Sequence, residues 1–382
     1  MKSVVYLDHA ATSWPKPPEV FEAMLQAMED AGANPGRGSH RMAVNASRVL
    51  YNARKTVAGL FGVGNPNDIV LTSNTTEALN LAIKGFLKPG DHVIASMIEH
   101  NSVRRPLEFL RRTQGVMVDY VPVDAEGNID LKEVEAAFCA NTRLVVCSHS
   151  SNLLGSILPI GEIGEMAVKR GAVLLVDAAQ SAGMLAIDVK EMNIGMLAFP
   201  GHKGLLGPQG TGGLYVSPEI DLEPLLHGGT GGQSEAVDQP SVRPDRYEAG
   251  TPNTIGFAGL QAGTAIVIDR TPEQIYRHEW ELTQALMEVL GSLKGVRLLG
   301  PELGKPRTGM ISFVVEKMES AMLAFKLDRE YGIAVRAGLH CTPLAHNASG
   351  TEKTGAVRAS VGMKTSKEDI DIMVNAMAEI LA

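Results

Sequence analysis

A lysine near the middle of the chain has the surroundings of a reactive amine. Lys203 lies in LAFPGHKGLLGPQG, where an apolar strand ends, a Gly-His-Lys turn follows and glycines surround the lysine. Partial burial and a cationic neighbour lower the pKa of a lysine, so that its neutral amine can attack a carbonyl and form a Schiff base. The same stretch taken alone also fits a surface lysine on a turn.

An aspartate lies at the end of an apolar run upstream of this lysine. Asp177 closes the run GAVLLVD, and Gln180 follows just beyond it. Ligands of α/β folds bind at the carboxyl ends of sheet strands. A carboxylate buried there needs a cationic partner, which a protonated pyridine nitrogen would provide. The alternative interpretation is a helix N-cap, where aspartate is common.

Four polar residues crowd the start of a predicted amphipathic helix in LTSNTTEALNLAIKGF. Free N–H groups, the positive end of the helix dipole and hydroxyl groups together form an anion site. Capping alone explains one such residue and hardly four. We therefore predict a phosphate cradle from Ser73, Asn74, Thr75 and Thr76.

Two more polar residues follow predicted strands. His100, in IEHNS, comes after HVIASM, where an imidazole could lie flat on an aromatic cofactor ring. Asn152, in HSSNLLG, comes after the predicted strand 144–148 and could hydrogen-bond a phenolic oxygen. Both residues also have purely structural interpretations, for Asn152 as a turn residue.

Alternating helices and short apolar strands must position these residues. From about Val44 to Tyr215 the pattern is typical of helices packed on a mainly parallel sheet, so the predicted fold class is α/β. A helix is predicted over Glu77–Phe86, because its apolar residues keep to one face. The predicted strands are Ile69–Thr72, His92–Ser96, Met117–Pro122, Leu144–Ser148, Val173–Asp177, Met196–Phe199 and Gly213–Val216.

The chain of 382 residues exceeds the usual size of a single core, which favours two domains. After Gly256 a long helical stretch to about Leu293 leads into shorter segments, including 308–315 and 321–331. We predict a large domain over 15–258 and a smaller C-terminal α/β domain over 259–382 that includes 1–14. The Gly-, Pro-, Gln- and Ser-rich segment Gly228–Pro252 is predicted to be a long loop, and such loops are more often functional than idle.

Composition and charge limit the partners. The formal net charge of −8 gives nucleic acid no general electrostatic attraction. Three cysteines, Cys139, Cys147 and Cys341, leave at least one thiol free, which favours a reducing compartment. The N-terminus lacks a signal-peptide core, and the apolar runs are far shorter than the roughly 20 residues that span a bilayer. We expect a cytoplasmic protein with no nucleic-acid or membrane partner and no metal site.

Together these motifs resemble the class V aminotransferase-like group of fold-type I pyridoxal-phosphate enzymes, most closely the cysteine desulfurase and selenocysteine lyase family. The similar stretches follow in order along nearly the whole chain: YLDHAAT, TTEALN, EHNS, DAAQS, GHKGLLGPQG, YEAGTPNT, RAGLHC and VRASVG. The resemblance implies the fold-type I architecture, with a large domain built on a mainly parallel seven-stranded sheet, a homodimer, and pyridoxal 5'-phosphate as cofactor.

The resemblance also implies a role for each residue. Lys203 would hold the cofactor as a Schiff base, Asp177 would pair with the pyridine nitrogen, and His100 would stack on the ring and help to move protons. Gln180 would lie near the phenolic oxygen. The other implied cofactor contacts are Thr75, Thr76, Asn152, His202 and, from the neighbouring subunit, Thr251.

The stretches RAGLHC and VRASVG match the short-loop desulfurase pattern. Cys341 would take sulfur from L-cysteine as a persulfide and leave L-alanine, and a sulfur-acceptor protein is an expected partner. Arg358 would hold the substrate carboxylate by a bidentate pair. The further implied substrate contacts are Arg336, Asn152 and, in the looser match NPGRGSH, Arg37 and His40.

Pro200 departs from the family pattern, which usually places Ser or Thr before GHK. Proline offers a phosphate neither a hydroxyl nor an N–H, so weaker cofactor binding is expected unless other contacts compensate. Three alternative functions stay open on the sequence: a selenocysteine lyase, a class V lyase or aminotransferase that does not use Cys341, and a non-enzymatic sulfur-transfer scaffold that binds the cofactor poorly.

Overall fold

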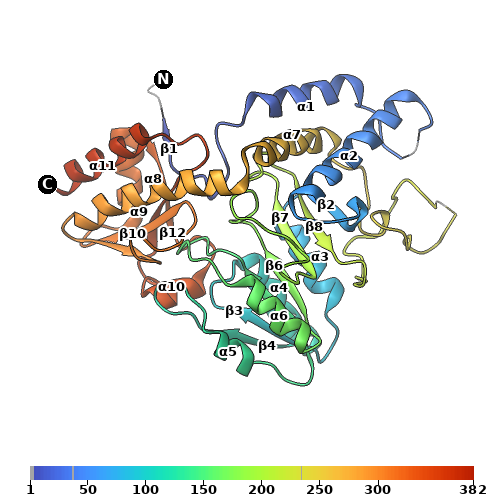
Figure 1. Ribbon diagram of the computed structural model, residues 1–382, viewed down its shortest axis with the longest axis horizontal. Helices are drawn as coiled ribbons and strands as arrows, with labels where there is room; N and C mark the ends of the chain where they lie inside the picture. Colours follow the sequence, from blue (N-terminus) through green and yellow to red (C-terminus); the bar gives the residue numbers. More distant parts are fainter. Residues whose placement is uncertain (1–3, 37, 234) are drawn as a thin grey trace.

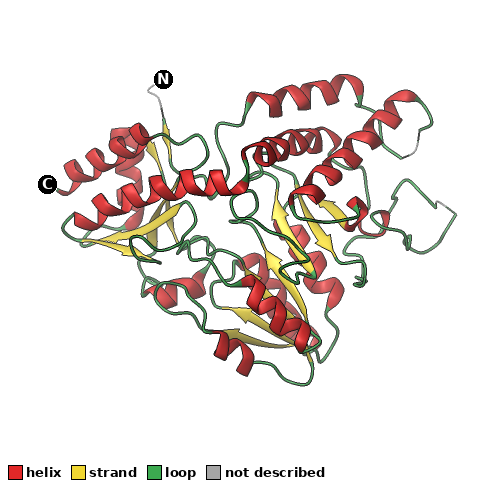
Figure 2. Cartoon of the chain, in the orientation of Figure 1, coloured by secondary structure: helices red, strands yellow, loops and turns green. Residues whose placement is uncertain are grey.

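The computed structural model of the chain describes residues 4–36, 38–233 and 235–382. Its centre is a seven-stranded sheet in the order β2-β8-β7-β6-β5-β3-β4 (Figure 1; Figure 2). Strands β4, β3, β5, β6 and β7 run parallel, whereas β8 is antiparallel to both β2 and β7. The bounds are β2 Ile69–Thr72, β3 His92–Ser96, β4 Met117–Val121, β5 Thr142–Ser148, β6 Val173–Asp177, β7 Met196–Pro200 and β8 Gly212–Val216.

The predicted α/β class and the mainly parallel seven-stranded sheet are confirmed. Every predicted strand is present, three with the predicted bounds and the others within two residues. The strands are apolar along their whole length because side chains on both faces are buried. In β3, Val93 and Ala95 join the core under α3 and α4, whereas Ile94 joins the core on the opposite face.

Helices cover both faces of this sheet. One core contains α3 and α4, and the other contains residues of α2, α5, α6 and α7. The helix predicted over 77–86 begins two residues earlier, at Thr75. The helices are α1 Pro18–Asp30, α2 Arg41–Leu60, α3 Thr75–Phe86, α4 Asn101–Gln114, α5 Leu131–Ala136, α6 Ile160–Lys169, α7 Thr254–Arg270, α8 Pro272–Ser292, α9 Ser320–Tyr331, α10 Pro343–Ser349 and α11 Lys367–Leu381.

The long helical stretch predicted from residue 256 to about 293 is present and consists of two helices. Helix α7 ends at Arg270, and Thr271 adopts φ 62° before α8 begins at Pro272. A proline cannot continue the helix before it, but it fits the first position of the next one. The Thr271 hydroxyl then accepts a hydrogen bond from the Gln274 N–H at 3.4 Å and caps α8.

A second, four-stranded antiparallel sheet has the order β12-β13-β10-β9. Its own hydrophobic core includes residues of α8, α9 and α11. Strand β1 pairs in parallel with β11, so β1 lies on this second sheet's side of the molecule (Figure 1). The bounds are β1 Val5–Tyr6, β9 Val296–Leu299, β10 Met310–Val315, β11 Ile333–Ala334, β12 Arg336–Gly338 and β13 Ala356–Ser360.

The predicted domain boundary at residue 258 falls inside α7 and stays a prediction. In its described part, the segment 228–252 is irregular apart from the short 3-10 helix Asp245–Tyr247. None of the helices that the structure describes is long and apolar enough to cross a membrane. Within the described ranges, no three His, Cys, Asp or Glu side chains form a group that could hold a metal ion.

Candidate active site

The carboxyl ends of the parallel strands meet at one cavity of about 240 Å³. His100 follows β3, Asp177 ends β6, and Lys203 follows β7. The sheet order places these three strand ends along one edge, where ligands of α/β folds bind. The predicted site residues that line this cavity are Thr75, Thr76, His100, Asn152, Asp177, Gln180, His202, Lys203, Arg336, Cys341 and Arg358.

Lys203 lies partly buried in the wall of this cavity. Burial lowers the pKa of Lys203 to about 8, and the nearby Arg358 guanidinium acts in the same direction while Asp177 opposes it. The turn is tight, since a Cβ on Gly204 would collide with the carbonyl oxygen of Ala182. About a tenth of the Lys203 amine is therefore neutral at pH 7, far more than for an ordinary lysine, and this fraction is able to attack a carbonyl.

Asp177 is 4% exposed at the end of β6. Burial raises the pKa of Asp177, whereas the Ala179 N–H, which donates to Oδ1 at 2.9 Å, and the Lys203 amine lower it. The residues that follow form turns, so the alternative interpretation of Asp177 as a helix N-cap is wrong. A buried carboxylate at this point suits a cationic ligand atom.

The start of α3 carries most of the predicted phosphate cradle. Asn74 is the N-cap, and its side chain accepts from the Glu77 N–H at 3.0 Å. Asn74, Thr75 and Thr76 line the cavity, with the Thr76 hydroxyl 2.8 Å from that of Ser102. Ser73 lines a different cavity, and its N–H donates to the Glu77 carboxylate, so its part in the cradle stays a prediction.

His100 and His202 present neutral imidazoles. Burial lowers the pKa of each ring to about 4, and the Lys203 charge adds to this effect. The Nδ1 atom of His100 accepts from the Ser102 N–H at 3.0 Å, so the ring proton lies on Nε2. The Nδ1 atom of His202 is buried and has no partner among the described residues.

Cys341 lies in a strained turn. His340 has φ 48° and Cys341 has φ 60°, a left-handed conformation that costs residues other than glycine roughly 1–2 kcal/mol each. The Asn152 amide donates to the His340 carbonyl at 2.6 Å, and the Asn101 N–H donates to the Cys341 carbonyl at 2.8 Å. These bonds hold the turn so that Cys341 is exposed at the cavity.

The substrate side of the cavity is strongly positive. Arg358 is 2% exposed and donates to the Asn152 carbonyl at 2.8 Å and to Asp8 Oδ1 at 3.1 Å. Burial lowers the pKa of Arg358, and the Asp8 carboxylate counteracts this shift. Arg336 is exposed on β12. A fixed guanidinium beside an open one is suited to a carboxylate ligand.

Besides Ser73, two predicted residues in the described part of the chain do not line this cavity. Thr251 lines a separate cavity of about 580 Å³ together with Ser73 and Glu77. His40 caps α2, where its Nδ1 accepts from the Ala43 N–H at 3.4 Å. Arg37 lies outside the described residues, so its predicted contact with the substrate stays a prediction.

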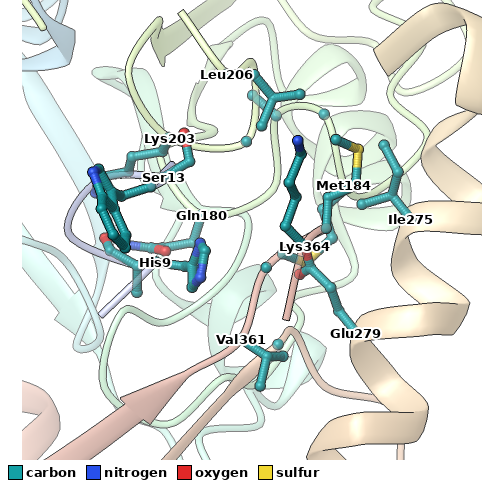
Figure 3. A pocket seen from close by; sticks show the side chains of 18 of the residues that line it. His9, Ser13, Gln180, Met184, Lys203, Leu206, Ile275, Glu279, Val361 and Lys364 are labelled. Atoms are coloured by element: carbon teal, nitrogen blue, oxygen red, sulfur yellow. The ribbon is translucent and has the colours of Figure 1, made fainter. Parts of the chain in front are cut away.

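A smaller cavity of about 50 Å³ lies beside the Lys203 turn (Figure 3). Gln180 and Lys203 line both cavities. On its far wall Glu279 projects from α8, and one carboxyl oxygen of Glu279 is buried without a partner in the described part of the chain (Figure 3). Burial raises the pKa of Glu279 to about 8, so this carboxyl is largely neutral at pH 7.

Sequence reasoning missed Asp8, Glu99, Ser148 and His340. Asp8 holds Arg358, Ser148 and His340 line the main cavity, and Glu99 is buried directly before His100. The only signal for Asp8 was its place in YLDHAAT, and Glu99 had none beyond its position beside His100.

The sequence profile of the aminotransferase class-V family matches residues 5–373, and the chain belongs to this family. Within the family it is 37% identical over 388 residues to a probable cysteine desulfurase of Methanothermobacter thermautotrophicus, which covers 100% of this chain and 95% of that protein. A probable cysteine desulfurase of Pyrococcus abyssi is 35% identical, with the same coverage of both proteins.

Solved structures agree with this assignment. The apo structure of a cysteine desulfurase from Thermococcus onnurineus NA1 matches with a TM-score of 0.93 and 36% identity, over 99% of this chain and 94% of that one. A cysteine desulfurase from Escherichia coli matches with a TM-score of 0.89 and 29% identity, over 99% and 96%. The resemblance inferred from the motifs is confirmed.

Proposed function

We propose that this protein is a pyridoxal-phosphate-dependent cysteine desulfurase, which converts L-cysteine to L-alanine and takes up the sulfur on Cys341 as a persulfide. One observation carries the proposal: Lys203, Asp177, Arg358 and Cys341 line a single cavity. The amine, the carboxylate, the guanidinium and the thiol are the groups that this reaction needs. The similarity to cysteine desulfurases over nearly the full chain supports it.

The residues fit the cofactor. Lys203 has a lowered pKa suited to binding an aldehyde, and buried Asp177 suits a protonated pyridine nitrogen. The unpartnered Nδ1 of His202 and the N-terminus of α3 at Thr75 and Thr76 suit a phosphate. When bound, the cofactor supplies an electron sink for the carbanion formed at the substrate α-carbon.

Arg358 orients the substrate. Its guanidinium is held from two sides, by Asp8 and by the carbonyl of Asn152, before any substrate arrives. A carboxylate that binds there is fixed relative to both Lys203 and Cys341, which line the same cavity. Prior orientation of this kind contributes to the rate because less freedom is lost at the reacting centre.

Lys203 and His100 move protons. The neutral Lys203 amine removes the substrate α-proton, and His100, with its proton on Nε2, is able to donate one. A free thiol with a pKa of about 8.5 is only a few per cent ionised near pH 7. The Arg358 guanidinium lies close enough to Cys341 for the two groups to interact electrostatically.

Cys341 takes the sulfur. Its thiolate attacks the substrate sulfur, a sulfur–sulfur bond forms, and the carbon–sulfur bond breaks with its electron pair left on the substrate carbon. Protonation of that carbon gives alanine, and the enzyme keeps a persulfide. The exposure of Cys341 supports a later transfer of this sulfur to an acceptor protein or thiol.

We further propose a cytoplasmic homodimer. Exposed apolar side chains along α1, namely Phe21 at 60%, Leu25 at 60% and Met28 at 57%, support a subunit contact there. Thr251 lies outside the catalytic cavity of its own chain, as a residue that serves the neighbouring subunit would. Three free thiols support a reducing compartment.

A persulfide assay tests the function. After incubation with L-cysteine, the wild type and Cys139→Ser should carry a persulfide and release alanine, whereas Cys341→Ser should do neither. Cys139 is the matched control because it is exposed but lies outside the cavity. Release of pyruvate in place of alanine would overturn the proposal.

A further variant, Cys341→Ala, distinguishes a selenocysteine lyase from a cysteine desulfurase. A selenocysteine lyase needs the same cavity but not the thiol of Cys341. Selenocysteine turnover that exceeds cysteine turnover in the wild type, and that survives Cys341→Ala, would favour that activity.

A further inference from the structure

Glu99 is a fully buried carboxyl that joins the ends of two central strands. Its Oε1 accepts hydrogen bonds from the Ser96 hydroxyl, which ends β3, and from the Ser148 N–H at 2.7 Å, which ends β5. Its Oε2 lies 2.9 Å from the Ser148 hydroxyl. Glu99 therefore links β3 to β5 through hydrogen bonds at the carboxyl ends of these strands, beside the catalytic cavity.

Three parts of the site depend on this link. Glu99 directly precedes His100, whose ring caps α4. Ser148 lines the catalytic cavity and is the register partner of Asp177 across β5 and β6. The Glu99 carbonyl accepts from the Thr342 hydroxyl at 3.3 Å, next to Cys341.

The charges around Glu99 favour its neutral form. Burial raises the pKa of Glu99 to about 8, the serine donors oppose this shift, and the negative charge of Asp177 adds to it. The other titratable group beside it is Cys147 on β5, whose thiol has a pKa that burial and Glu99 both raise. In the described part of the chain no lysine or arginine pairs with Glu99, whereas Asp177 interacts with Lys203.

Two carboxyls that share one buried region with a single cation cannot both ionise at low cost. Asp177 receives the stabilisation from Lys203 and from the Ala179 N–H, so Asp177 takes the charge. A protonated Glu99 can still make all its contacts, because the Ser148 hydroxyl can accept from the carboxyl proton as readily as it can donate.

We propose that Glu99 is a positioning residue that keeps its proton in the working enzyme, so that it holds His100, Ser148 and the Cys341 turn in place while Asp177, of these two buried carboxyls, carries the negative charge. The inference rests on the proposed function and deepens it. It assigns a need for two buried carboxyls in opposite charge states, one just after β3 and one at the end of β6, on either side of β5.

Glu99→Gln and Glu99→Ala test the proposal. Glutamine is neutral and has the shape of a protonated glutamate, so Glu99→Gln should retain kcat/KM within about threefold of the wild type. Alanine leaves the Ser148 N–H buried without its partner, and it should lower kcat/KM by about tenfold or more. Equal losses in the two variants would overturn the proposal, because they would mean that the ionised form is needed.

The pH dependence of stability is a second test, which needs neither enzyme turnover nor a folded alanine variant. If the pKa of Glu99 rises on folding, the folded protein binds more protons than the unfolded chain between about pH 4.5 and 8, so the wild type loses stability as the pH rises through that range. Cofactor-free Glu99→Gln should lose less stability than the wild type over that range, measured by urea unfolding at several pH values. An unchanged pH dependence would show that Glu99 holds no such proton.

Glu279→Gln is the matched control. Glu279 is also a buried glutamate whose pKa is raised to about 8, but it lies on α8, away from the link between β3 and β5. The Glu279→Gln variant should change the pH dependence of stability in the same way. Unlike Glu99, the residue it replaces makes no hydrogen bond, within the described part of the chain, to the segments that carry His100 and Cys341. If the wild type itself forms no persulfide, the proposed function fails, whereas the unfolding measurement still decides the protonation of Glu99.

Discussion

Arg336 and Arg358 lie directly opposite each other on the neighbouring antiparallel strands β12 and β13. Like charges in such a pair repel, and among the residues that the structure describes only Arg358 of the two has an ion-pair partner, Asp8. Both side chains line the catalytic cavity. The pair therefore leaves an excess of positive charge that a substrate carboxylate would neutralise.

The first prediction concerns the shape of the Arg358 side chain. Arg358→Lys keeps the charge but loses the planar fork that binds a carboxylate through two parallel bonds. We expect the KM for L-cysteine to rise by about tenfold, with a smaller change in kcat, in steady-state assays of alanine release. Arg297→Lys is the control, since Arg297 donates to the Ser349 carbonyl outside the cavity. An unchanged KM in Arg358→Lys would contradict this role.

The second prediction concerns Asp8, which orients Arg358. Asp8→Asn weakens a charged hydrogen bond to a buried guanidinium, which costs about 2 kcal/mol of stability. The same change should raise the KM for L-cysteine. In the double variant with Arg358→Lys the two effects on KM should not add, because they act through one contact. Additive effects would show that Asp8 acts elsewhere.

The sequence predicts the local parts of this site and misses those made by distant partners. Strand ends such as Asp177 are visible because apolar runs stop at turn residues. Asp8 and Arg358 are separated by 350 positions, and no local pattern connects them. The break at Thr271 was missed because an apolar helical pattern continues on both sides, although Pro272 marks the next helix start. Sequence alone did not separate Ser73 from Thr75 and Thr76, because adjacent residues at a helix start can face different cavities.

The third prediction concerns Lys203 in the cofactor-free protein. The pKa of its amine is lowered to about 8, so the neutral, reactive fraction grows as the pH rises and levels off above that value. The rate at which the cofactor-free protein captures pyridoxal 5'-phosphate should therefore rise from pH 6 to about pH 8 and then level off. Stopped-flow absorbance would follow it. Lys203→Arg should capture none, and a flat profile in the wild type would refute the lowered pKa.

The fourth prediction concerns Pro200, which is buried at the end of β7 opposite Gly212. Gly212 lies against the Asn74 backbone at the start of α3, so residue 200 is close to the proposed phosphate site. Pro200→Ser supplies a hydroxyl there, and a hydrogen bond to a charged group should tighten cofactor binding by about tenfold. Pro200→Ala, which removes the ring without adding a hydroxyl, is the control. Equal dissociation constants for the two variants would place residue 200 out of reach of the phosphate.

The last prediction concerns the backbone of Cys341. Its φ of 60° is a conformation that glycine adopts without steric cost, whereas residues with a Cβ are strained by roughly 1–2 kcal/mol. Cys341→Gly should therefore be more stable than Cys341→Ala by about 1 kcal/mol, measured by urea unfolding of the cofactor-free protein.

At Cys139 we expect the opposite order of stability for the glycine and alanine variants. It is an exposed thiol that is not among the described residues with positive φ, so Cys139→Gly should be less stable than Cys139→Ala by about 0.5–1 kcal/mol, because glycine gains more freedom on unfolding. The difference in stability between the glycine and alanine variants should therefore have opposite signs at the two cysteines. If Cys341→Ala proves the more stable variant, the thiol is not presented by a left-handed turn, and strain plays no part in exposing it to the substrate sulfur.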